Sequence, residues 1–175
     1  MAERFDRTRH RTAPEKKEFE ELTINIDRVT RVVKGGRRFR FKALVAVGNG
    51  KDKIGVGVAK GADVTTAISK AASVAHKNIV TIVIEDGTIP HDVQVKFGGA
   101  NVLLKPAGPG TGIIAGGVVR SIIGLTGIKN LLSKSLGSTN KVNIAYATVE
   151  ALQQLVPKDK WLNAKPKTPK KEDAQ

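Results

Sequence analysis

The sequence predicts an α+β protein of two domains: a three-stranded antiparallel sheet with one helix, followed by an α/β sandwich. Three observations carry this prediction. Apolar residues alternate from Arg38 to Val47, the pair Gly35–Gly36 precedes that run, and apolar residues recur at helical spacing after Asp63. These patterns indicate a half-buried strand, a hairpin and an amphipathic helix. The predicted segments are a flexible arm at 1–20, a first domain at 21–90, a second at 91–156 and a basic tail at 157–175.

The first domain opens with a strand near Leu22. Val29 breaks the alternation of this strand, which predicts a bulge near Arg28. The glycine pair suits a primed turn, because both of its residues tolerate positive φ. In the returning strand, Phe39, Phe41 and the odd-numbered residues to Val47 form one predicted apolar face.

A third strand and a helix complete this domain. Glycines at alternate positions, Gly55 and Gly57, predict that another element approaches that face closely. Asp63 is a predicted N-cap of the helix, since its carboxylate can accept from a free backbone N–H. A further short strand is expected at Thr81–Glu85.

In the second domain we expect strands at Val102–Lys105 and Leu131–Leu136 and helices at Ile113–Leu125 and after Ser138–Asn140. The first of these helices is so apolar that it should be largely buried. Its glycines should allow close backbone contact. The predicted inner face of the last helix comprises Val142, Ala145, Tyr146, Val149, Leu152 and Val156.

Charge provides the main functional signal. The formal net charge is +14, which favours a polyanionic partner, most often nucleic acid. Between Arg28 and Lys42 lie seven basic residues and no acid, a density that favours phosphate binding over the alternative of a solvated strand face. The predicted RNA-binding residues are Arg28, Arg31, Lys34, Gly35, Gly36, Arg37, Arg38, Arg40, Lys42, Lys51, Lys53 and Lys60.

Several other classes of protein are disfavoured. There is no cysteine, and the three histidines lack metal-ligand spacing, so we predict neither a metal site nor thiol chemistry. No apolar run approaches the length of a membrane span, and no export signal precedes residue 20. Aromatic residues are too few for a module that stacks single-stranded bases.

The segment Gly110–Ala115 matches the GxGxxA pattern of a dinucleotide-binding loop, between a predicted strand and a predicted helix. However, no Asp or Glu occurs between Asp92 and Glu150, where the ribose-binding acid would fall, and no P-loop Lys follows. A tight turn with close helix packing is therefore the favoured interpretation, and we predict no cofactor, no small-molecule substrate and no enzymatic activity. A nucleotide-binding enzyme using Gly110–Gly112 remains an alternative, as does a free regulator that binds double-stranded RNA.

Three separated motifs resemble the bacterial-type small-subunit ribosomal protein S-five family, from about residue 22 to residue 156. They are Val33–Arg37 with Phe39-x-Phe41-x-Ala43-Leu44-Val45 and Gly55-x-Gly57-x-Ala59-Lys60; Gly110–Gly117 with Arg120; and Lys134-x-x-Gly137-Ser138-Thr139-Asn140. The resemblance implies a first domain similar to a double-stranded-RNA-binding fold. It implies a second domain of the α/β type found in that family.

The resemblance also implies a function. Such a protein is expected on the cytoplasmic ribosome, where it binds small-subunit rRNA and supports assembly. Its expected neighbours are ribosomal proteins S-four and S-eight and the mRNA entry path, where the family influences decoding accuracy. The antibiotic-linked loop of the family matches Thr30, Val33, Lys34, Gly35, Gly36 and Arg37, and its protein interface matches Gly110, Thr111, Gly112 and Arg120.

Overall fold

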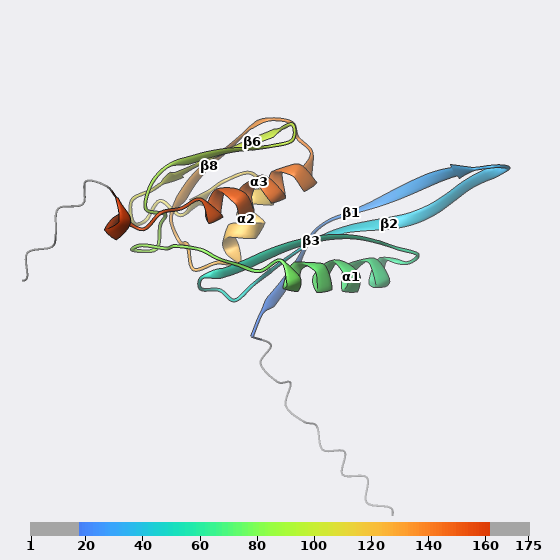
Figure 1. The fold of residues 1–175 in the computed structure, drawn as a ribbon, viewed down its shortest axis with the longest axis horizontal. Coiled ribbons are helices and arrows are strands. Elements are labelled where there is room, and N and C mark those ends of the chain that lie inside the picture. The colour runs from blue at the N-terminus through green and yellow to red at the C-terminus, as the bar shows by residue number, and fades with distance from the viewer. Residues whose placement is uncertain (1–17, 162–175) are drawn as a thin grey trace, which may run out of the picture.

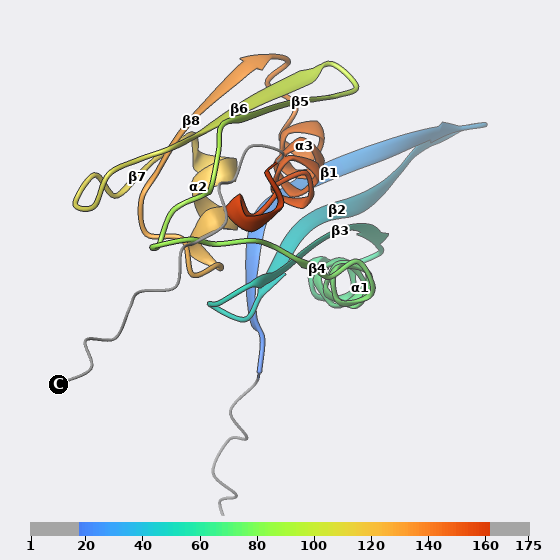
Figure 2. The same ribbon diagram turned by 60° about the vertical axis from the view of Figure 1, so that its left-hand side comes forward.

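The computed structural model describes residues 18–161, so the predictions for residues 1–17 and 162–175 lie outside the described part. The described residues form four layers (Figures 1 and 2). Helix α1 (Val64–Lys77) covers one face of a first sheet, whose other face packs on α2 (Gly117–Gly124) and α3 (Lys141–Gln153). A second sheet lies beyond these two helices, and no helix of residues 18–161 lies over its outer face (Figure 2).

The first sheet has the strand order β1-β2-β3-β4 and is antiparallel throughout. Its long strands are β1 (Glu20–Val33), β2 (Gly36–Gly48) and β3 (Lys53–Gly61). The strand expected at Thr81–Glu85 is shorter than predicted, because β4 contains only Val80–Thr81. The β1–β2 hairpin extends beyond the rest of the molecule as an arm (Figure 1).

Two local details of this hairpin differ from the prediction. The register of β1 against β2 shifts between Thr23 and Asn25 rather than near Arg28, where pairing is regular. At the tip, Val33 pairs with Gly36, so the two turn residues are Lys34 and Gly35. Only Gly35 has a positive φ, of 87°, whereas a type I′ turn needs two such residues, so this is not the primed pair we expected.

The glycines of β3 bring α1 close to the sheet, as predicted. A Cβ atom on Gly57 would overlap the carbonyl oxygen of Ala71 and lie 2.5 Å from the backbone nitrogen of Ala75. Four alanines of α1 are fully or almost fully buried against Ala43, Val45 and Val47 of β2. Asp63 is the N-cap residue, and its amide donates to Thr66 Oγ1 at 3.2 Å.

The opposite face of the first sheet joins a second core. Leu44 and Ala46 of β2 and Ile54 and Val56 of β3 pack into one cluster with α2, α3 and the second sheet. The loop after β2 strengthens this junction, since Gly50 N–H donates to the Leu125 carbonyl at 3.0 Å and Gly127 N–H to the Lys51 carbonyl at 2.7 Å. The two halves of the chain therefore share a continuous apolar interior.

The second sheet has the order β5-β6-β8-β7. Its antiparallel strands are β5 (Val93–Phe97), β6 (Ala100–Pro106) and β8 (Leu131–Gly137), and β7 (Ile113–Ile114) pairs parallel with β8. The predicted helix at Ile113–Leu125 is therefore wrong at its start. The first two residues form a strand and the helix begins only at Gly117. Its glycines do not mediate close contacts with other described residues, because none of these lies within 4 Å of a Cβ built on Gly116, Gly117 or Gly124.

Helix α3 begins at the expected cap, where Asn140 Oδ1 accepts from the Val142 amide at 3.2 Å. Its predicted inner face is wrong in part. The buried residues are Ile144, Ala145, Ala147, Thr148, Ala151 and Leu152, whereas Val156 is exposed. Because the helix lies between two sheets, it is buried on two sides and presents no single apolar stripe.

Candidate nucleic-acid interface

The basic residues of the arm lie on two faces. The strand register assigns them, because directly paired residues in an antiparallel ladder share a face. Arg31 pairs with Arg38, Val29 with Arg40, and Lys42 with Lys60. Arg31, Arg38, Arg40 and Lys60 are all exposed and together form what we call the arginine face. No acid of the described residues is paired within this set, so its charge is available to an anion.

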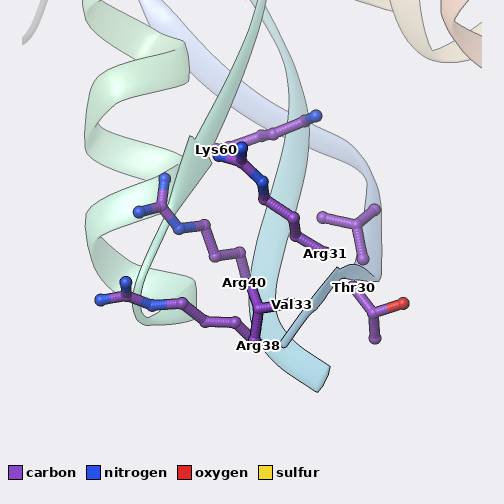
Figure 3. A pocket seen from close by; sticks show the side chains of 7 residues that line it. Thr30, Arg31, Val33, Arg38, Arg40 and Lys60 are labelled. Atoms are coloured by element: carbon purple, nitrogen blue, oxygen red, sulfur yellow. The ribbon is translucent and has the colours of Figure 1, made fainter. Parts of the chain in front are cut away.

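These residues line an open hollow of about 300 Å³ (Figure 3). Its lining is Val29, Thr30, Arg31, Val33, Arg38, Arg40 and Lys60. Three guanidinium groups in one hollow suit phosphate oxygens, since each presents a planar fork of N–H donors that can bind two oxygens at once. Val29 and Val33 add apolar lining to these donors, and Val33 is the residue next to the turn.

The other face of the arm carries fewer basic residues. The guanidinium carbon of Arg28 lies 3.8 Å from the centroid of the Phe39 ring, a cation–π contact. Phe39 is 47% exposed, so the predicted apolar face of β2 is not buried at this residue, whereas Phe41 packs against the α1 core. Arg37 lies on this second face, opposite Val32, which is 76% exposed.

Asp27 lies at the base of the arm, immediately before the acid-free segment Arg28–Lys42. It lies opposite Lys42, and Lys42 Nζ is 2.8 Å from Asp27 Oδ2. Asn25 Nδ2 donates to Asp27 Oδ1 at 2.7 Å, and Lys141 Nζ of α3 donates to Asn25 Oδ1 at 2.8 Å. Lys42 is therefore already paired. Pairing of Asp27 with Lys42 could have been inferred only from the strand register.

The hydrogen bonds from Lys42 and Asn25 lower the pKa of Asp27. A carboxyl group whose pKa is lower when folded adds stability at pH values above its unfolded pKa, about 3.9, and loses it as the pH falls through the folded pKa. We therefore expect Asp27→Asn to remove a small stabilisation at neutral pH and less at pH 2. The effect should be small because Asp27 is partly exposed to solvent. Urea unfolding at both pH values checks this, and an equal loss at both would contradict the ionic origin.

The remaining predicted RNA-binding residues lie in two other places. Lys34, Gly35 and Gly36 form the tip of the arm, next to the arginine face. Lys51 in the β2–β3 loop and Lys53 at the start of β3 lie at the opposite end of the sheet, where Asn49 Oδ1 accepts from both of their amides at 2.9 Å. The structure therefore does not bring these two lysines together with the tip of the arm, because the β2–β3 connection lies at the Gly48 end of β2 and the tip lies at its Gly36 end.

The glycine loop of the second half forms a separate candidate surface. Gly110 and Gly112 have φ values of +89° and +72°, and the Gly112 amide donates to Asn130 Oδ1 at 3.0 Å. The loop leads into β7 and not into a helix, so it lacks the strand–turn–helix context of a dinucleotide site. Arg120 is exposed on the outward side of α2.

The backbone conformation of Gly112 explains why this position should be a glycine. Nothing lies within 4 Å of a Cβ built there, so its φ and not lack of space restricts substitution. We expect Gly112→Ala to destabilise the chain by about 1 kcal/mol, the approximate cost of the left-handed conformation for alanine. Gly108→Ala is the matched control, since it has open space and no positive φ. Equal stability of the two variants in urea unfolding would contradict this explanation.

Within residues 18–161 no group of three or more potential metal-ligating side chains was found. In the same range, no helix is long and apolar enough to cross a membrane.

The chain matches known proteins in both halves. A family model described as the N-terminal domain of ribosomal protein S5 matches residues 19–83, and one described as its C-terminal domain matches residues 95–162. The small ribosomal subunit protein uS5 of Campylobacter jejuni is 55% identical over 140 residues, covering 80% of this chain and 95% of that protein. The protein of the same name from Thermus thermophilus is 51% identical over 138 residues, covering 79% and 85%. The chain therefore belongs to the ribosomal protein S5 family, whose members are structural proteins of the small ribosomal subunit and not enzymes.

Proposed function

We propose that the arm fastens this protein to small-subunit rRNA through the arginine face. The observation that carries the proposal is the grouping of Arg31, Arg38 and Arg40 around one open hollow, without a paired acid among the described residues. Lys60 extends the same surface onto β3, and Lys34 extends it to the tip. Contacts of this kind hold phosphates and fix orientation, and they carry little base specificity.

The two halves of the chain have different partners in this proposal. The first, residues 21–90, binds rRNA with the arm, and the tip at Thr30–Arg37 is the segment linked to antibiotic response. The second, residues 91–156, presents Gly110–Gly112 and Arg120 to a ribosomal protein. Support comes from the exposure of Arg120 and from the open space around the glycines of α2. Ribosomal proteins S-four and S-eight are the proposed neighbours, near the mRNA path, where such contacts affect decoding accuracy.

The salt dependence of binding tests the RNA contact directly. We expect the full chain to bind protein-free small-subunit rRNA with a steep linear fall of log K against log salt, because each phosphate contact releases counterions. Several phosphates contacted by the arm predict a slope of roughly −3 to −5. A slope near zero would contradict the proposal. Saturable binding of NAD or ATP by the same chain would support the nucleotide alternative instead.

A further inference from the structure

The face of the second sheet that no described helix covers has a composition unlike that of the arm. Its outward residues, which we call the outer face, are Gln94, Lys96, Asn101, Leu103, Lys105, Ile114, Leu132, Lys134 and Leu136. Leucine and lysine alternate across the ladder: Leu103 pairs with Lys134, and Lys105 with Leu132. No strand of this sheet contains an acid.

The apolar part of the outer face is substantial. Ile114 is 53% exposed, Leu132 37% and Leu136 39%. Leu103, Ile114 and Leu132 line a shallow hollow of about 140 Å³, whose rim includes Lys105 and Lys134. A hollow of this kind suits one apolar side chain of a partner, with groups of opposite charge to the lysines around it.

From these features we propose that the outer face docks a second protein of the small subunit, through an apolar anchor side chain flanked by Asp or Glu. RNA fits this surface poorly, since phosphate backbones give aliphatic side chains no apolar partner and interfaces with nucleic acid are more polar and more cationic than this one. The arm, by contrast, carries arginines and is rich in charge. The proposal rests on membership of a ribosomal family and does not require the arm to bind rRNA.

Charge also argues against two other binding partners for the outer face, a second copy of this chain and its own terminal segments. A second copy of this chain would bring another net charge of +14. The terminal segments 1–17 and 162–175 each contain more Lys and Arg than Asp and Glu, so neither complements three lysines. The complementary partner is therefore a different, acidic surface.

The chain has no cysteine, so a single thiol can report on this face. We would assemble small subunits with a Leu132→Cys full chain and compare its maleimide labelling with that of the free chain. Ser73→Cys, on the exposed side of α1, is the reactivity control for the free chain. In the free chain we expect Leu132→Cys to label at a rate similar to that of Ser73→Cys. In the subunit we expect Leu132→Cys to label about tenfold more slowly than in the free chain, because a docked partner excludes solvent from the interface centre. Unchanged labelling in the subunit would overturn the proposal.

A second measurement separates a protein from RNA. Zero-length carbodiimide coupling in the same subunits should join Lys105 or Lys134 to an Asp or Glu of another ribosomal protein, as read by peptide mass spectrometry. Ultraviolet cross-links of these peptides to rRNA, with no carboxylate link, would overturn the proposal.

A Leu132→Asp, Lys134→Glu chain should keep the salt slope of binding to protein-free rRNA. A shallower slope for this variant would mean that the outer face itself binds RNA, and it would also overturn the docking proposal. A slope near zero for the unmodified chain would instead contradict only the proposal that the arm binds rRNA.

Discussion

Replacement of Arg31, Arg38 and Arg40 by alanine is expected to make the salt dependence of rRNA binding shallower by about 2 to 3 units of slope. Each arginine that contacts a phosphate contributes about one unit, and these three share one hollow with no acid of residues 18–161 paired to any of them. All three side chains are exposed, so the substitutions should leave the fold intact. The measurement is the slope of log K against log salt for the full chain and protein-free rRNA.

Two controls make this result specific. A variant with Lys70, Lys77 and Lys129 changed to alanine loses the same charge from exposed positions away from the arm. We expect its slope to be nearly that of the unmodified chain. The single change Arg37→Ala, on the other face of the arm, should change the slope less than the single change Arg38→Ala. If the lysine control and the arginine variant lost slope equally, net charge and not the arginine face would determine binding.

Gly57→Ala is expected to destabilise the protein by about 3 kcal/mol. A methyl group there would meet backbone atoms of Ala71 and Ala75, which cannot move aside by a change of rotamer. Helix α1 would have to shift away from the sheet and loosen the core formed by its alanines with Ala43, Val45 and Val47. Urea unfolding measures the loss, which corresponds to a lower midpoint by roughly 1 to 2 M.

Gly36→Ala provides the matched control, since nothing lies within 4 Å of a Cβ built there and its φ is not in the positive range. We expect a change within about 0.5 kcal/mol, as for most surface substitutions. A Gly57→Ala protein as stable as Gly36→Ala would mean that α1 does not lie against β3 in the way described.

Local patterns predicted the elements that depend on near neighbours in the chain. The alternating glycines of β3 indicated a close approach, and α1 is the element that approaches. The cap at Asn140 and the strand at Leu131–Gly137 also follow from local residues. These features are specified by backbone preferences and by a period of two, so neighbouring residues suffice to predict them.

The features that were predicted wrongly depend on packing between distant segments. Helix α3 lies between two sheets, so Ile144 and Ala147 are buried although a single stripe was expected. Ile113–Ile114 is apolar enough for either a helix or a strand. Pairing with Leu131 and Leu132 of β8 decides for a strand. The same limit applies to Leu44 and Ala46, whose burial requires the second half of the chain.

In the candidate site, too, some features follow from local sequence and others depend on pairing between strands. Its cations could be found by counting, but their assignment to two faces required the register of β1 against β2, which places Arg31 beside Arg38 and Asp27 beside Lys42. The actual turn at Lys34–Gly35 determines that register. A turn at Gly35–Gly36 would have altered the pairing along the arm.

The most direct test of the arm's role uses its tip as a probe of distance. Val32 is 76% exposed near the turn, and a Val32→Cys chain can carry an iron chelate that cleaves nearby RNA in assembled small subunits. We predict strong cleavage of rRNA at a few clustered positions from this site and much weaker cleavage from Lys77→Cys on α1. Absence of rRNA cleavage from Val32→Cys in subunits that contain the protein would contradict the proposal that the arm lies against rRNA.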